Sequence, residues 1–355
     1  MSRRFLHVVV NNVISRPSAY TLHSLNASSF FYPERPSRSA ATVEDDLLPQ
    51  PAMHFHRPCS PPEYYGSMDF MPLGRDRTNI LGVDHRGRAI LCDTALPAVR
   101  TMPTLHAPKS FPISIAAGNS LYVLNSRLGP PQRHTFEALL HGLLPDCATH
   151  GWFWRSLPPP PYVHYPDYGE DELDDDDDEI VQPYEIRAYT VVGDLQIWIS
   201  TVGAGTYSLD MESGIWSKPG EWSLPFSGCA EFVPEHKMWF GFSSEDNQFC
   251  ACDLTCEEQP TLQKVWELDL RPHQDWIPTK SYLVPLGSGK FCIAKLFLKS
   301  EDTTSAAGYM YEKTERFAVL TGVEVENNLD GVGLCMIQHK SKRYCLEDRV
   351  VEQVI

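Results

Sequence analysis

Short runs of β-branched and aromatic residues alternate with Gly, Pro, Asp and Asn along most of the chain. Runs of roughly five to eight such residues between turn-forming residues predict β-strands. No window of about 12 residues places apolar residues with helical spacing. The best exception, His134–Leu144, fits a short helix or a strand followed by a turn. The pattern therefore predicts an all-β protein.

The predicted strands follow one another closely over the whole chain. They cover Leu6–Val10, Tyr20–Leu25, Ile80–Val83, Ala89–Asp93, Pro112–Ala116, Leu121–Asn125, Ile186–Val192, Gln196–Thr201, Gly205–Asp210, Ala230–Val233, Lys237–Phe242, Phe249–Leu254, Gln263–Leu268, Ser281–Pro285, Lys290–Leu298, Phe317–Val325 and Leu334–His339. Many short strands at such spacing are typical of a sandwich, a barrel or a propeller.

A repeated order of strands and turns favours the propeller. Four stretches share it: Ile80–Pro103, Phe111–Ser126, Glu185–Trp222 and Gly228–Leu254. Ser281–Leu298 with Arg316–Glu326 forms a weaker fifth copy. The copies start about 40 to 50 residues apart, the size of a four-stranded blade. We expect a β-propeller of kelch-like type, with six blades as the best fit to the length and seven as the alternative.

The chain ends are expected to close this propeller. The strands Leu6–Val10 and Tyr20–Leu25 would share a blade with the late strand Leu334–His339, which removes an open sheet edge. We treat residues 1–355 as a single domain. Residues 162–183, rich in acidic residues, are expected to form a disordered loop, and residues 32–65 a long irregular loop.

A series of short motifs spans almost the whole sequence in a fixed order. They include MDF (Met68–Phe70), LYVLNS (Leu121–Ser126), FEAL (Phe136–Leu139), SLPPPPY (Ser156–Tyr162), IWISTVGAGTYSLD (Ile197–Asp210), WSKPGEWSLPF (Trp216–Phe226), FVPEHKMWFGFS (Phe232–Ser243), CDL (Cys252–Leu254), LGSGKFCIAKLF (Leu286–Phe297), FAVLTGVEVE (Phe317–Glu326) and HKSKRY (His339–Tyr344). From about Arg3 to Tyr344 the sequence resembles a plant family, expanded in grasses, known as domain of unknown function 1668.

The resemblance implies a fold but no activity. The family looks kelch-like or F-box-associated in its strand pattern, which implies a propeller by analogy. No helical F-box precedes the first predicted strands in this sequence. We therefore do not expect a direct role in a ubiquitin ligase.

The formal net charge of −16 is concentrated in one segment. Nine of the ten residues Glu170–Glu179 are carboxylates, and removing these nine charges from −16 leaves −7 for the rest of the chain. Such a body does not favour nucleic acid or an anionic membrane as partner. The acidic run is interpreted as a solvated loop, with docking of a basic protein as the alternative.

Segments for export or membrane insertion are not recognisable. The apolar run Phe5–Val10 is too short for the core of a signal peptide, and no run reaches the roughly 18 apolar residues of a membrane span. The ten cysteines are scattered and are interpreted as reduced thiols. We expect an intracellular protein, in cytoplasm or nucleus.

Two local patterns allow functional interpretations. Cys250, Cys252 and Cys256 have spacing that could bind zinc or copper, but no further ligand pair is nearby, so structural cysteines are favoured. The stretch Gly287–Lys290 lacks the remaining residues of a phosphate-binding loop and is predicted to be a hairpin turn.

Three further features also have two interpretations each. The basic stretch His339–Arg343 could be a nuclear-import signal, but the solvent edge of a strand is favoured. His236 and Asp253 need spatial proximity before they could be a catalytic pair. Most of the eight tryptophans are expected to pack between blades, with one or two available as partner contacts.

No catalytic, cofactor-binding or metal-binding residue can be assigned from sequence motifs. We therefore favour a non-enzymatic, monomeric protein-interaction scaffold without a cofactor. The alternatives are a galactose-oxidase-like or hydrolytic propeller enzyme, and a carbohydrate-binding, lectin-like propeller.

Overall fold

The structure is a computed structural model that describes most of the chain. It covers residues 3–13, 19–34, 43–56, 66–74, 76–96, 98–127, 134–144, 149–164, 185–256, 259–268, 275–304, 310–328 and 333–355. Within these residues the only helices are two short 3₁₀ turns, η1 (Ala27–Phe30) and η2 (Pro161–His164). The prediction of an all-β fold is confirmed, and the ambiguous segment His134–Leu144 contains a strand, β11 (Phe136–Leu143).

The described strands form five sheets. The first has the order β25-β1-β2-β4 and contains β1 (Phe5–Asn12), β2 (Ala19–Asn26), β4 (Met53–His56) and β25 (Arg349–Val354). The second contains β5 (Met68–Leu73), β6 (Asn79–Asp84), β7 (Ala89–Asp93) and β8 (Ala98–Met102) in chain order. The third contains β9 (Pro112–Ala117), β10 (Ser120–Asn125), β11 and β12 (His150–Ser156).

The fourth sheet joins two four-stranded units. One contains β13 (Ile186–Val192), β14 (Gln196–Thr201), β15 (Gly205–Asp210) and β16 (Trp216–Gly220), and the other β17 (Phe226–Val233), β18 (Met238–Ser243), β19 (Phe249–Cys252) and β20 (Leu262–Trp266). Parallel pairing of β13 with β17 connects them. The fifth sheet contains β21 (Ile277–Gly287), β22 (Lys290–Thr304), β23 (Met310–Asn327), β24 (Leu334–Cys345) and β3 (Val43–Asp46).

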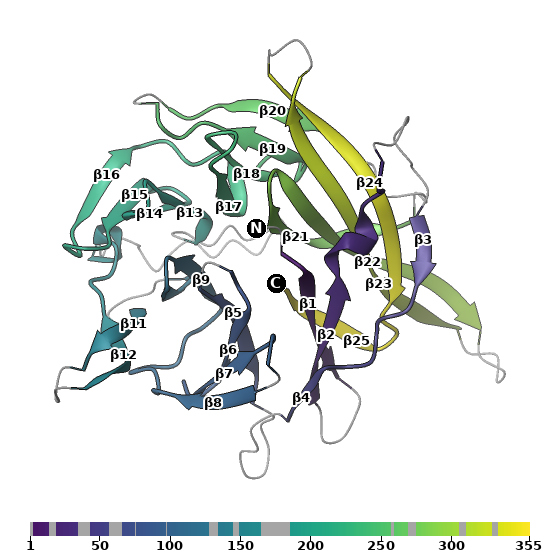
Figure 1. Cartoon of the computed structure of the whole chain (residues 1–355), viewed down its shortest axis with the longest axis horizontal. Coiled ribbons are helices and arrows are strands. Elements are labelled where there is room, and N and C mark those ends of the chain that lie inside the picture. The colour runs from purple at the N-terminus through teal and green to yellow at the C-terminus, as the bar shows by residue number, and fades with distance from the viewer. Residues whose placement is uncertain are drawn as a thin grey trace.

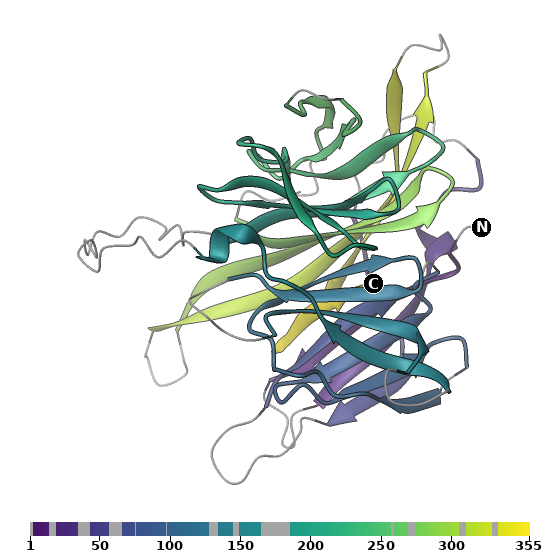
Figure 2. The same ribbon diagram turned by 90° about the vertical axis from the view of Figure 1, so that its left-hand side faces the viewer.

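These sheets are arranged around a common centre, and both chain ends lie near it (Figure 1). The arrangement is propeller-like. The long hairpin of β22 and β23 extends beyond the other sheets, as the view turned by 90° also shows (Figure 2).

The two chain ends meet in one sheet, but not through the strand that the sequence suggested. β1 pairs in antiparallel fashion with β25, the last strand of the chain. Leu334–His339 instead lies in β24, which pairs with β23 and with β3. The expected partner was therefore wrong, because the charged segment around Arg349 hid a further strand.

The two long loops expected from the sequence are described only in part. Residues 32–65 contain the short strands β3 and β4, so this region is not irregular throughout; residues 35–42 and 57–65 lie outside the described residues. Of the acidic segment 162–183, only the end of η2 is described, and the run Glu170–Glu179 lies outside the described residues.

Apolar side chains on both faces of the strands form the core. In β1, Val8 and Val10 pack in a cluster with β21 and β22, whereas Val9 points to the opposite face and packs with β5 and β6. Such burial on both faces explains why the strand is a continuous apolar run rather than an alternating one.

The tryptophans belong to this core, as predicted. Trp154, Trp239 and Trp276 are buried members of apolar clusters. The other five are partly buried and pack against the same kind of cluster: Trp152, Trp198, Trp216, Trp222 and Trp266. Their large rings fill the space between neighbouring sheets.

Candidate functional site

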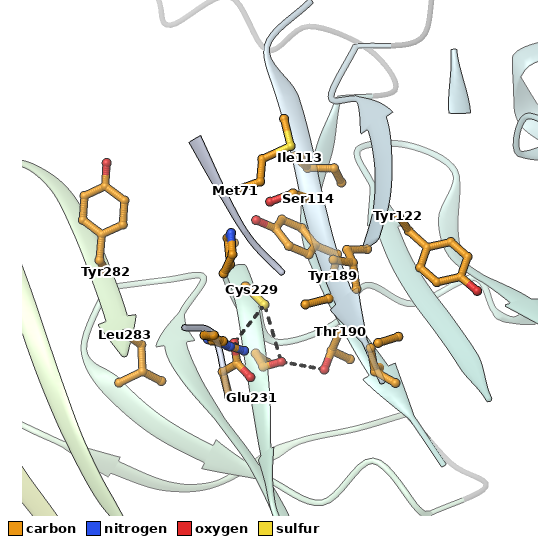
Figure 3. Close-up of a pocket in the computed structure, with 18 of the residues that line it drawn as sticks. Met71, Ile113, Ser114, Tyr122, Tyr189, Thr190, Cys229, Glu231, Tyr282 and Leu283 are labelled. Carbon is orange, nitrogen blue, oxygen red and sulfur yellow. Dashed lines mark hydrogen bonds and ion pairs between the residues drawn. The ribbon is translucent and has the colours of Figure 1, made fainter. Parts of the chain in front are cut away.

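A cavity of about 1550 Å³ lies at the centre of the molecule. Most of its lining comes from β5, β9, β13, β17, β21 and β25, one strand from each four- or five-stranded unit. Figure 3 shows apolar and polar side chains facing this space, among them Met71, Ile113, Tyr189, Cys229 and Glu231. A concave space of this size with a few convergent polar groups is the natural candidate for a binding site.

An ion pair between Arg77 and Glu231 crosses part of the cavity wall. The Arg77 Nη2 atom lies 2.5 Å from Glu231 Oε1, and each side chain is 19% exposed. Burial alone would lower the pKa of Arg77, but the charge and hydrogen bond of Glu231 raise it above its ordinary value. Arg77 therefore stays charged and tied to its partner.

Local backbone irregularities place these two side chains. Arg77 has a φ of 52°, in the left-handed region that non-glycine residues rarely adopt. On the other side, the register of β17 against β18 shifts between Ser227 and Glu231, and Gly228 in this stretch has a φ of 75°. Bulges of this kind redirect side chains, here towards the cavity.

A second guanidinium adds positive charge beside this pair. Arg3 Nη2 donates a hydrogen bond to the Arg77 carbonyl at 3.1 Å. Burial and the charge of Arg77 lower the pKa of Arg3 to about 10, and Glu231 and Asp76 offset part of this shift. Glu231 thus acts as a counter-charge for both partly buried guanidinium groups.

Cys229 and Tyr189 lie next to one another on the same wall. Burial raises the pKa of the Cys229 thiol well above its ordinary value, and the negative charge of Glu231 adds to this effect. Burial likewise raises the pKa of Tyr189. A protonated thiol is a weak nucleophile, so the geometry does not favour Cys229 as a covalent catalyst.

A second group of charged residues comes from three other strands. Asp69 on β5, Lys280 on β21 and Glu352 on β25 all line the cavity. Burial, followed by the charge of Glu352, raises the pKa of Asp69 to about 6, and Lys280 offsets only part of that shift. Burial lowers the pKa of Lys280, while Glu352 and Asp69 act in the opposite direction.

The raised pKa of Asp69 makes stability depend on pH. The folded state favours the protonated carboxyl of Asp69 over the ionised one. The stability that this preference contributes is fully present below about pH 4 and is lost as the pH rises through about 6. We expect Asp69→Asn to be more stable than the wild type by on the order of 1–3 kcal/mol at pH 8, and equally stable near pH 4. Thermal and urea unfolding at both pH values would measure this difference. A variant less stable than the wild type at pH 8 would contradict the expectation.

The environments of Cys250, Cys252 and Cys256 favour the interpretation as structural cysteines. Cys250 and Cys252 are buried in one apolar cluster, and burial raises the pKa of each thiol to about 12. Cys256 is exposed. Among the residues that the structure describes, no three or more His, Cys, Asp or Glu side chains are grouped so that they could hold a metal ion.

The glycine-rich stretch Gly287–Lys290 is a hairpin turn, as predicted. Gly287 pairs with Lys290 at the start of the β21–β22 ladder. The two residues between them, Ser288 and Gly289, have φ values of 56° and 70°. Two positive φ values are the signature of a tight hairpin turn of type I′.

The basic stretch His339–Arg343 contacts the acidic strand β3. Lys342 Nζ lies 2.9 Å from Asp46, and Arg343 Nε lies 2.5 Å from Asp45. His339 and Ser341 are buried. The stretch therefore forms part of the pairing between β24 and β3, and two of its cations already have carboxylate partners.

His236 and Asp253 make separate contacts. The ring Nε2 of His236 lies 3.0 Å from the carbonyl oxygen of Val325, whereas Asp253 Oδ1 accepts hydrogen bonds from the backbone and hydroxyl of Thr255. No interaction joins them within the described part of the chain, so the structure does not support a catalytic pair.

Sequence analysis missed the charged residues of the cavity. Asp69, Arg77, Glu231, Lys280 and Glu352 come from four separate parts of the chain, so no local motif indicates them. The available signal was a charge within a mostly apolar run, as in Met68–Leu73. Such a charge usually indicates only the solvent face of a strand.

None of the helices that the structure describes is long and apolar enough to cross a membrane. A comparison with curated protein sequences finds no significant match. A comparison with solved structures matches a protein from Lactobacillus plantarum, with 10% identity and a TM-score of 0.42 over 97% of this chain and 99% of that chain. The β-propeller domain of Myceliophteria thermophila Cps50 (Swd1) has 9% identity and a TM-score of 0.37 over 90% of each chain.

A third solved structure, a streptogramin B lyase, has 10% identity and a TM-score of 0.32 over 78% of this chain and 87% of that chain. The comparison with family models is more specific. The model described as "Protein of unknown function (DUF1668)" matches residues 3–344, nearly the whole sequence. The chain therefore belongs to the DUF1668 family.

Proposed function

We propose that the chain is one six-bladed β-propeller domain. Six apolar clusters support this count. Each cluster lies between two neighbouring units, and following the clusters around the centre leads back to the unit that contains β1. In this arrangement β25 is the innermost strand of the blade that holds the N-terminal strands. Pairing of the two chain ends would then close the ring and remove a sheet edge. The kelch-like type is supported by the family resemblance of the sequence.

The function that the geometry supports best is that of a non-enzymatic protein-interaction module, and we propose that it acts as an intracellular monomer. The observation that carries it is a pair of exposed apolar side chains at one end of the cavity: Leu195 is 53% exposed and Phe232 is 45% exposed. Both line the cavity opening, with the exposed carboxylates of Asp194 and Glu212 beside them.

The strand register explains why these side chains share one end of the cavity. β13 and β17 run parallel, with Thr190 opposite Ala230. Leu195 follows the end of β13, and Phe232 lies near the end of β17. An apolar anchor with an acidic surround suits a basic protein surface that inserts an apolar side chain, rather than nucleic acid or an anionic membrane.

Truncating both apolar side chains should remove this anchor. We expect the double variant Leu195→Ala with Phe232→Ala to lose most partners that proximity labelling recovers with the wild-type chain, because truncation of a central anchor weakens binding at least about tenfold. The measurement is quantitative mass spectrometry of labelled proteins from cells that naturally express the chain.

Leu47→Ala serves as the matched control, because Leu47 is 84% exposed and lies away from the cavity. It should retain the wild-type partners. The proposal fails if the wild type yields no reproducible partners, or if the double variant retains the same ones.

An enzyme is the second candidate, and the charged residues inside the cavity favour it. A hydrolytic or galactose-oxidase-like propeller would use side chains that converge on this space, as Asp69 and Lys280 do. A lectin-like function would require tryptophans at a rim, whereas all eight pack in or against the apolar clusters.

A further inference from the structure

Asp69 and Lys280 are two opposite charges that face the same cavity without pairing. Both line the space of about 1550 Å³, from strands β5 and β21. Each influences the ionisation of the other, so they lie within electrostatic range. Among the described residues, however, neither forms an ion pair or a hydrogen bond through its charged group.

Lys280 and Glu352 each make contacts with other groups. The Lys280 Nζ atom lies 4.7 Å from the centre of the Tyr282 ring, in a cation–π contact. The Tyr282 hydroxyl donates to the backbone carbonyl of Glu352 at 2.8 Å, which holds the ring in place. The Glu352 carboxylate accepts a hydrogen bond from Asn11 of β1 at 2.6 Å, which ties it to the neighbouring strand.

Asp69 is partly buried and has no counter-charge at ion-pair distance among the described residues, and a charge in such a position is costly. A ligand that supplied the missing counter-charges would remove this cost, and the cavity is large enough to hold one. The side chains near them are suited to an apolar or aromatic body, since Met71, Ile113, Tyr189 and Leu283 face the same space (Figure 3).

We propose that the cavity binds a small zwitterion, with its ammonium group at Asp69, its carboxylate at Lys280 and its apolar body against the tyrosine and aliphatic walls. This goes beyond the protein-interaction role, because it needs no protein partner. Asp69 and Lys280 lie near the starts of β5 and β21, whereas Leu195 and Phe232 lie at the opposite strand ends, after β13 and near the end of β17.

Charge balance favours a zwitterion over a simple amine or a simple acid. An amine alone would be attracted by Asp69 and Glu352 but would bring a second ammonium group beside Lys280. An acid alone would pair with Lys280 but would face two carboxylates. Only a ligand with both groups neutralises Asp69 and Lys280 together.

Three probes with one common body test this directly. L-Phenylalanine carries both charged groups, 2-phenylethylamine carries only the ammonium, and 3-phenylpropanoate carries only the carboxylate. Isothermal titration calorimetry and saturation-transfer NMR at pH 8 would measure their binding to the full chain. We expect phenylalanine to bind at least about tenfold more tightly than either single-charge probe, because each of those probes leaves one of the two cavity charges without a partner.

Two variants assign the contacts. Asp69→Asn and Lys280→Met should each weaken phenylalanine binding at least about tenfold, while the matched exposed variants Glu221→Gln and Lys218→Met should leave it unchanged. Melting temperatures measured in parallel separate loss of binding from loss of folding, and Asp69→Asn is expected to remain folded at pH 8 because it removes a desolvated charge.

The proposal is overturned if no binding of phenylalanine is seen up to about 10 mM, above the millimolar Kd that even inefficient small ligands reach. It is also overturned if 2-phenylethylamine binds as tightly as phenylalanine, which would indicate a site for cations. Unchanged binding to both cavity variants would place the ligand elsewhere and would overturn it as well. None of these outcomes depends on whether the Leu195 and Phe232 surface binds a protein.

Discussion

Replacement of Glu231 by Gln should destabilise the fold by about 3 kcal/mol, the cost of breaking a largely buried ion pair from one side. Glu231 lies 2.5 Å from Arg77, and the guanidinium of Arg3 rests on the Arg77 backbone. Without the Glu231 carboxylate, the repulsion between the guanidinium groups of Arg3 and Arg77 would no longer be offset by this counter-charge. Urea unfolding followed by tryptophan fluorescence would measure the change.

Two controls separate this effect from a general loss of side-chain charge. Glu221→Gln breaks an exposed ion pair with Lys218 and should cost no more than about 0.5 kcal/mol. Adding Arg77→Met to Glu231→Gln should recover part of the lost stability, because it removes one of the uncompensated cations. A cost below about 1 kcal/mol for Glu231→Gln would show that the cavity hydrates this pair well enough to make it unimportant.

Removal of β25 should abolish cooperative folding. A chain that ends at Asp348 would lose the antiparallel pairing of β25 with β1 and the buried side chains of Val351, Val354 and Ile355. Each aliphatic side chain contributes about 1.5–3 kcal/mol when buried, so the three together approach the roughly 5–15 kcal/mol that stabilises a typical domain. We expect thermal unfolding monitored by circular dichroism to show no sharp transition.

Complementation provides the control for this truncation. A synthetic peptide of residues 349–355 added in trans should restore part of the transition, because it can pair with the exposed edge of β1. The same peptide with Val351→Asp and Val354→Asp should not restore it, since both side chains pack in the cluster between β1 and β22. A truncated chain that melts at the wild-type temperature would show that β25 contributes little.

Strand positions could be predicted because they depend on local composition. The run Phe5–Asn12 is strand-like in isolation, and the turn at Ser288 and Gly289 is visible from glycine placement alone. β5, by contrast, was missed: its sequence, Met68–Leu73, holds a charge and a proline that lower its strand-like character. β25 was missed for a related reason, because polar residues interrupt its apolar positions.

The candidate site could not be predicted from the sequence. Asp69, Lys280 and Glu352 come from strands near the beginning, the last third and the end of the chain, and only the packing of sheets around one centre brings them into the same cavity. A charged residue on a strand has the same sequence signature whether it faces bulk water or an enclosed space. Its desolvation, and hence its altered pKa, exists only in the folded arrangement.

Residue order along the chain was enough to predict an all-β protein with strands in units of similar size, tryptophans in the core and membership of the DUF1668 family. Each of these follows from residues close together in the chain or from an ordered set of motifs. Two features became apparent only from the folded chain: β25, not Leu334–His339, joins the N-terminal strands, and charges from several strands share the central cavity. The physical reason is that strand pairing and desolvation depend on contacts between distant segments, which composition and spacing do not encode.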